Sequence, residues 1–164
     1  LSSRTHPVAS LTFGEIEASV AGFEASGGLI RAAPYFSSIE SEKNKAFVSK
    51  FKHRFGSHVP ISAETEAAYF QVHLFAEAAK RANSFVRKDI LQSLPTFTFE
   101  APQGAIQVDG RTHHTHLWPR IGIFGADGKF EIVCGSPQPI FPDPYLIETE
   151  TKMRNWNKNN VLGR

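Results

Sequence analysis

Apolar residues recur at the start of the chain with the spacings of short strands and helices. Segment 7–13, PVASLTF, has small and β-branched residues after a proline and predicts a short buried strand. Residues 14–25 have apolar positions at nearly helical spacing, and Gly27 and Gly28 follow them, as glycines often follow a helix. Segment 29–36, LIRAAPYF, predicts a second strand. The pattern therefore indicates a strand–helix–strand unit, the kind that builds parallel sheets.

Helical spacing dominates the middle of the chain. Residues 41–56 place a stripe of Phe and Val on one side, and Gly56 ends this predicted helix. Residues 63–82 are apolar nearly all round, which predicts a helix buried between other elements. A third helix is expected at 86–94, before Pro95.

From Pro95 to Tyr145 the pattern changes to strands and turns. The expected strands are TFTFE, AIQV, HTHLWPRIGIFG and KFEIV. The Asp127-Gly128 pair lies between IGIF and FEIV and predicts a hairpin. The proline-rich segment 137–145, PQPIFPDPY, cannot be a central strand or a helix, so an extended connector is expected there.

Composition narrows the class of protein. The chain has 164 residues, and its formal net charge of +2 is too balanced to indicate direct DNA binding or an anionic membrane partner. No apolar run approaches the roughly 20 residues of a membrane span, and no targeting signal is visible, so the compartment stays open. Cys134 is the one cysteine, which excludes an internal disulfide; its place at the end of an apolar strand predicts a small buried side chain.

Three histidines cluster in the segment THHTHLWPR. On a strand His114 and His116 point to one face and His113 to the other, so a metal would need further ligands from elsewhere. No HExxH, GxSxG, GxGxxG or phosphate-loop motif is present. A solvated or hydrogen-bonded strand is therefore favoured over a metal site, and neither an enzyme nor a cofactor is expected. A hydrolase that uses these histidines stays as a distant alternative.

Several segments occur in the order and spacing of a known family. They are SLTFGE, AAPYFSSI, EAAYFQVHL, APQGAIQV and PQPIFPDPYL. Together they resemble the C-terminal half of the amide- and urea-binding proteins, whose fold is that of the type I periplasmic-binding proteins. The resemblance implies an α/β fold of three layers with a mostly parallel sheet, present here only as the C-terminal portion of a two-lobed clamshell. It also implies that the histidine segment is a turn that leads into a strand, without metal or catalysis.

The resemblance also implies how the chain is divided between lobes. Residues 1–36 would belong to the second lobe, and the helices and strands of 37–118 would pack on the first lobe. Residues 119–140 would form a hairpin that returns to the second lobe, and 141–164 would be a proline-rich connector and tail. The N-terminal lobe would then be a missing partner.

The function that the resemblance implies is binding of a small neutral amide or urea. The first alternative is a periplasmic solute receptor of an ABC transporter. The receptor closes on its ligand, and the membrane permease recognises the closed form. The second is a cytoplasmic amide sensor that restrains an antiterminator partner at an aliphatic amidase operon. A third is that the chain is the remnant of a disrupted gene.

Candidate ligand-binding residues lie near the predicted strand ends. The resemblance assigns an amide contact to Thr12, and proximity to strand ends adds Ser10 and Tyr35. Hydroxyl groups suit a neutral amide because they donate and accept hydrogen bonds without carrying charge. From the residues alone, the favoured role of Thr12 is an N-cap for the helix that begins near GEIE; with the resemblance the two roles are even, and one residue can fill both.

The chain departs from the family's pattern at three positions. Phe13 and Gly14 stand where the family has Thr and Ser, and Glu64 stands where it has Trp before the EAAY segment. The departures at Phe13 and Gly14 are expected to change the shape of the pocket or the size of its ligand, and no role is carried over to Glu64.

Overall fold

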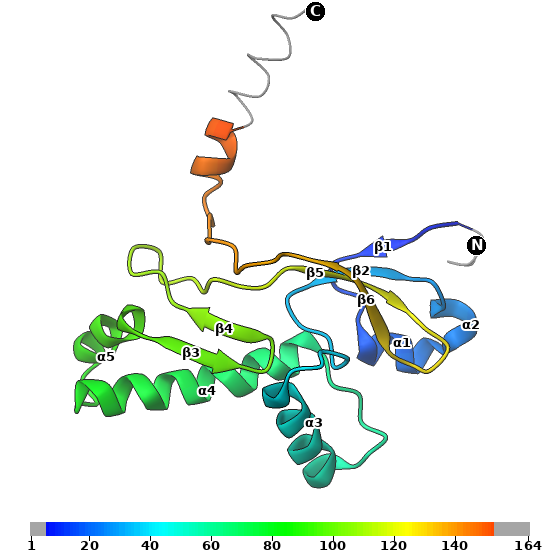
Figure 1. The fold of residues 1–164 in the computed structure, drawn as a ribbon, viewed down its shortest axis with the longest axis horizontal. Coiled ribbons are helices and arrows are strands. Elements are labelled where there is room, and N and C mark those ends of the chain that lie inside the picture. The colour runs from blue at the N-terminus through cyan, green and yellow to red at the C-terminus, as the bar shows by residue number, and fades with distance from the viewer. Residues whose placement is uncertain (1–5, 153–164) are drawn as a thin grey trace, which may run out of the picture.

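The computed structural model describes residues 6–152, which form a small mixed sheet joined to a body of helices (Figure 1). The sheet has the order β1-β2-β5-β6. Its strands are β1 (Ala9–Ser10), β2 (Ile30–Ala33), β5 (Arg120–Phe124) and β6 (Phe130–Gly135). β1 and β2 are parallel, as the strand–helix–strand pattern predicts. The α/β class is confirmed.

The expectation of a mostly parallel sheet is wrong for these strands. β2 pairs antiparallel with β5, and β5 pairs antiparallel with β6. For β5 and β6 the cause is the predicted hairpin: a tight turn, closed by the Gly125 N–H donating to the Lys129 carbonyl at 2.8 Å, joins the two strands. Strands joined by so short a turn can only be antiparallel.

Aromatic rings form the core on one face of the sheet. Phe36, Phe124 and Phe130 are buried, and the rings of Phe36 and Phe124 lie 5.2 and 5.1 Å from that of Phe130. A Cβ at Gly122 would lie 2.9 Å from the Phe36 ring, so this strand position has to be small. The helices α1 (Glu15–Ala21) and α2 (Phe23–Ser26) lie beside the same sheet (Figure 1).

The other face of the sheet has apolar side chains in contact with solvent. Leu11 and Ile121 are 75% and 41% exposed, and with Ile30 and Ala32 they line a shallow groove. Of the three expected layers, the described residues therefore supply the sheet and the helices on one side.

The second body consists of helices and a hairpin. Its elements are α3 (Glu42–Phe55), α4 (Ala63–Ala82), α5 (Arg87–Ser93), a 3-10 turn (Leu94–Thr96), and the antiparallel strands β3 (Thr98–Ala101) and β4 (Gly104–Gln107). Ser41 and Ser62 cap α3 and α4, because their hydroxyls accept hydrogen bonds from the first-turn N–H groups of Asn44 and Thr65. Asn83 ends α4 in the left-handed conformation.

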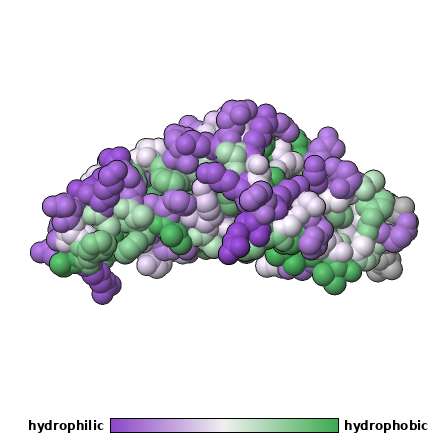
Figure 2. Space-filling view, turned by 90° about the horizontal axis from the view of Figure 1, so that it is seen from below, coloured by the Kyte–Doolittle hydropathy of each residue, from purple (hydrophilic) through white to green (hydrophobic). Residues whose placement is uncertain are grey.

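One side of α4 is not buried by the rest of the described chain. Ala68, Val72 and Phe75 recur at i, i+4 and i+7, and all three are exposed. The prediction of a helix buried on all sides is therefore wrong for these residues. In Figure 2, which views the molecule from below, hydrophobic surface gathers towards the α4–α5 end and towards the α1–α2 end.

Three segments run between the sheet and the helical body (Figure 1). They are residues 34–41 after β2, residues 113–119 before β5, and residues 136–142 after β6. The second and third lie side by side, because Leu117 and Ile140 form an antiparallel bridge. The predicted proline-rich connector is thus an extended segment. Among the described helices, none has the length and hydropathy to cross a membrane.

Candidate functional site

The loop that follows β1, residues 10–14, is the first candidate site; we refer to it as the strand-end loop. The Ser10 hydroxyl accepts hydrogen bonds from the N–H groups of Phe13 at 2.9 Å and Thr12 at 3.2 Å, which fixes the turn. The N-cap of α1 is Gly14, whose N–H donates to the Glu17 carboxylate at 2.8 Å. The N-cap alternative for Thr12 is therefore wrong. Its exposed side chain lies just beyond the carboxyl end of β1, where open α/β sheets bind ligands.

Tyr35 lies apart from this loop surface. Its ring is fully buried, and its hydroxyl donates to the Asn44 side-chain carbonyl at 2.8 Å. Burial raises the pKa of the phenol, so it stays a neutral donor. The structure brings Ser10 and Thr12 together at the surface and places Tyr35 in the core under α3.

Arg31 connects the strand-end loop to the start of α4. Its guanidinium is 1% exposed, and it contacts Glu15 at 3.2 Å and Glu64 at 2.9 Å. It also fills the space beside Gly14, where a Cβ would lie only 1.6 Å from Nη1. Burial raises the pKa of Glu15 to about 7, against the opposing effects of a backbone hydrogen bond and of Arg31.

Sequence reasoning missed this pair of contacts, although one signal was present. An arginine inside the apolar segment LIRAAPYF has to be buried with a partner or point to solvent. Glu64, the departure from the family's tryptophan, supplies one of the two partners.

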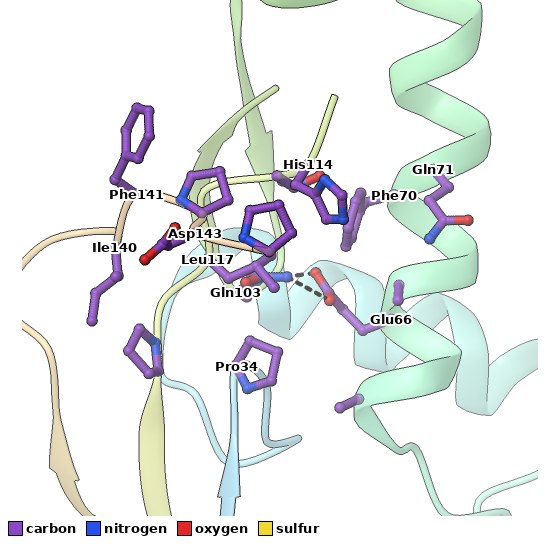
Figure 3. Close-up of a pocket in the computed structure, with 16 residues that line it drawn as sticks. Pro34, Glu66, Phe70, Gln71, Gln103, His114, Leu117, Ile140, Phe141 and Asp143 are labelled. Carbon is purple, nitrogen blue, oxygen red and sulfur yellow. Dashed lines mark hydrogen bonds between the residues drawn. The ribbon is translucent and has the colours of Figure 1, made fainter. Parts of the chain in front are cut away.

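The second candidate site is a cavity of about 580 Å³ beside α4, which we call the crossing cavity (Figure 3). Ala67 and Phe70 of α4 line one side of it. Leu117, Ile140 and Phe141 line it from the two adjoining segments that run between the bodies. The cavity therefore lies where these segments meet the helical body.

Two buried polar side chains, Glu66 and Gln103, face each other in this cavity (Figure 3). The Glu66 carboxylate accepts hydrogen bonds from the Gln103 side-chain amide at 2.9 Å and from its backbone N–H at 3.3 Å. Burial raises the pKa of Glu66 to about 7, although these bonds and the charge of Arg120 act in the opposite direction. The side-chain carbonyl of Gln103 has no hydrogen-bond partner among the described residues.

The turn that carries Gln103 has a backbone conformation that requires glycine at position 104. Gly104 has φ +126°, and a Cβ there would lie 2.8 Å from the Trp118 indole nitrogen. That nitrogen donates to the Ala105 carbonyl at 2.7 Å, and Arg120 donates to the Gln103 carbonyl at 2.7 Å. The APQG motif is therefore a turn whose conformation positions Gln103 against Glu66.

The histidine segment is a turn that leads towards β5, as the resemblance implies, and the strand expected there from the local pattern alone is wrong. The Asp109 carboxylate accepts three hydrogen bonds from Arg111 and Thr112, and His113 follows with φ +58°. The His114 ring nitrogen Nδ1 lies 2.9 Å from the Thr112 carbonyl oxygen. Across residues 6–152, no three His, Cys, Asp or Glu side chains are grouped so that they could hold a metal ion.

Asp143 and Cys134 can also be placed. The Asp143 carboxylate accepts hydrogen bonds from the N–H groups of Ile147 and Thr149, so this side chain has a local structural role. Cys134 is exposed, so the prediction of a buried thiol is wrong. The β-bulge between Ile121 and Gly122 shifts the register just where Cys134 pairs.

Comparison with known proteins shows which family and which solved structures this chain resembles. A family profile for the periplasmic binding protein domain matches residues 1–151. A solute-binding protein of an ABC transporter from Rhodopseudomonas palustris BisB5, solved with 3,4-dihydroxybenzoic acid, matches with TM-score 0.70 and 22% identity over 80% of this chain and 36% of that chain. A periplasmic binding protein from Burkholderia mallei matches with TM-score 0.71 and 13% identity over 82% of this chain and 37% of that chain. A leucine-binding protein from Thermotoga maritima MSB8 matches with TM-score 0.62 and 22% identity over 74% of this chain and 34% of that chain.

These solved structures share the fold with the chain at low identity, and the chain spans about a third of their length. A protein named limonene hydroxylase, from Geobacillus stearothermophilus, is 34% identical over 128 residues. That match covers 78% of this chain and 23% of the named protein. Its name therefore describes a polypeptide of which this chain resembles less than a quarter.

Proposed function

The chain belongs to the periplasmic binding protein domain family, and on that premise we propose that it is the C-terminal part of a substrate-binding protein for a small amide or urea, acting as the solute receptor of an ABC transporter. The observation that carries the proposal is the exposed hydroxyl of Thr12 at the carboxyl end of β1. In the resembling family the matching threonine contacts the amide. Location in the periplasm follows for the proposed receptor.

The strand-end loop suits a neutral ligand. Arg31, the cation that fills the space beside Gly14, is already paired with Glu15 and Glu64, so an anionic ligand would have to displace a carboxylate. The hydroxyl of Thr12 can donate to an amide carbonyl or accept from an amide N–H. Phe13 is one departure from the family's pattern. Its side chain packs against the core, so it does not cover the Thr12 hydroxyl.

The similar structures suggest competing ligands. One was solved with a dihydroxybenzoic acid and another is named for leucine, and both ligands carry a carboxylate. The paired state of Arg31 argues for amides over these acids. The exposed apolar positions of α4 and of the outer sheet face support the proposal that a further lobe, outside this chain, completes the clamshell. Under that proposal residues 37–118 pack on the missing lobe.

Calorimetric titration of the purified chain, and of the longest gene product that contains it, with acetamide, urea, benzoate and leucine tests the function. We expect acetamide or urea to bind and to raise the melting temperature by mass action. Thr12→Val should weaken that binding by about 5- to 30-fold, the loss of roughly one hydrogen bond. The matched control is Thr98→Val, an exposed threonine on β3. Binding of benzoate or leucine alone, by either protein, would contradict the amide assignment.

The second candidate function is the cytoplasmic amide sensor with an antiterminator partner. The same fold and loop serve both, so the distinguishing observations lie in the intact gene product. An export signal that is cleaved in cells supports the transporter. Retention in the cytoplasm, with an amide-dependent complex with an RNA-binding regulator, supports the sensor.

A further inference from the structure

We propose that the crossing cavity is a second small-molecule site, which takes an aromatic or branched apolar molecule bearing an N–H donor, such as an aromatic primary amide. None of the residues that line it belongs to the strand-end loop. The proposal therefore adds a site to the chain and does not depend on which ligand Thr12 contacts.

The apolar walls define the body of this ligand. Phe70, Leu117, Ile140 and Phe141 line the cavity together with several prolines. The cavity is open to solvent on one side, and its volume of about 580 Å³ falls within the range of clefts that bind small organic ligands. Acetamide or urea would leave most of that space unfilled, whereas a ring would contact the aromatic and aliphatic walls.

The polar groups define the other end of the ligand. Gln103 is 1% exposed, and its side-chain carbonyl has no hydrogen-bond partner in the described part of the chain. Its amide nitrogen is occupied by Glu66, so the free atom is an acceptor. A buried acceptor without a donor is unfavourable, and an N–H group from a ligand satisfies it.

The charge of the lining selects against acids. Glu66 and Asp143 line the cavity, and no lysine or arginine lines it. A carboxylate ligand would meet the Asp143 carboxylate, and that of Glu66 wherever this group is ionised, with no cationic partner among the lining residues, whereas a neutral amide of the same shape avoids this repulsion. Benzamide and benzoate have nearly the same shape but differ in charge and in the N–H donor, so they serve as matched probes.

The test is titration of the purified, isotope-labelled chain with benzamide, benzoate and acetamide, followed by NMR and calorimetry. We expect saturable benzamide binding with backbone shifts at Leu117 and Ile140, and at least 10-fold weaker binding of benzoate and acetamide at that site. Ala67→Phe places a ring into the cavity and should abolish benzamide binding. The control is Ala68→Phe, an exposed neighbour on the same helix that does not line the cavity.

Three results would overturn the proposal. Benzamide could fail to bind the wild-type chain at millimolar concentration, in which case the cavity is a packing surface for another protein segment. Benzoate could bind as tightly as benzamide. Benzamide binding could be lost in Thr12→Val and kept in Ala67→Phe, which would assign it to the strand-end loop and leave the proposed function standing. If Ala67→Phe fails to fold, shifts at Leu117 and Ile140 in the wild-type chain decide, and their absence refutes the site.

Discussion

Replacement of Glu66 by glutamine should remove a large part of the pH dependence of stability. The carboxyl group is fully buried and has a pKa of about 7 in the folded chain, against a usual value of 4.5. Below about pH 4.5 it is protonated in both the folded and unfolded states. Between about 4.5 and 7 the unfolded chain releases the proton while the folded chain keeps it, so the free energy of unfolding falls as the pH rises. Above 7 the loss is complete.

The size of this loss follows from the shift in pKa. A change from 4.5 to about 7 corresponds to roughly 3 kcal/mol that the fold loses across this window. Glu15 also has a pKa of about 7 and acts in the same direction, so Glu66→Gln should reduce the total slope by about half. A glutamine at 66 can accept from the Gln103 backbone N–H, and once the Gln103 side-chain amide turns over, its own amide can donate to the Gln103 side-chain carbonyl. At pH 8 the variant should be about 1–3 kcal/mol more stable than the wild type.

Urea denaturation followed by circular dichroism at half-unit steps from pH 4.5 to 8 gives the slopes. Glu100→Gln is the control, because Glu100 is an exposed residue on β3. It should change stability by less than about 1 kcal/mol. An unchanged slope in Glu66→Gln, or a variant less stable than the wild type at pH 8, would show that burial does not set the protonation of Glu66.

Three further predictions concern other residues. Tyr35→Phe removes the hydroxyl that donates to the buried Asn44 side-chain carbonyl, and it should lower the free energy of unfolding by about 1–3 kcal/mol in chemical denaturation. An effect near zero would mean that the Asn44 carbonyl accepts a hydrogen bond from another donor in the variant. Gly104→Ala forces a Cβ against the Trp118 indole at φ +126° and should destabilise the chain by more than about 2 kcal/mol, with a change in tryptophan fluorescence. Cys134 is exposed and should react with Ellman's reagent without denaturant at one thiol per chain; protection until unfolding would contradict its placement.

Short-range patterns predicted most of the elements. The end of the first long helix at Gly56 and the hairpin around Asp127-Gly128 depend on neighbours within four residues. These signals are local, so the sequence carries them directly. The resemblance added the fold, which the family profile confirms.

Long-range relations account for the error in sheet direction. The pairing of β5 with β2 joins residues about 90 positions apart, and no periodicity specifies its direction. The error over the capping role of Thr12 has a local cause, because the Ser10 hydroxyl fixes the turn and Gly14 begins the helix. The interactions of Glu66 with Gln103, and of Arg31 with Glu64, cross more than 30 positions. The sequence did contain one sign of these interactions: Arg31 and Glu66 are charged residues within segments that are otherwise apolar, so each needs a polar partner if it is buried.

The contact between Gly14 and Arg31 makes the two positions energetically dependent on each other. A Cβ at position 14 would lie 1.6 Å from Nη1 of Arg31, so a larger residue there requires the guanidinium to move. That movement would separate the guanidinium from the buried Glu15 carboxylate, which lies 3.2 Å from Nη1. Because Gly14 has φ −117°, which other residues also adopt, the cost of a side chain at position 14 is set by the ion pair of Arg31 and not by backbone strain in the loop.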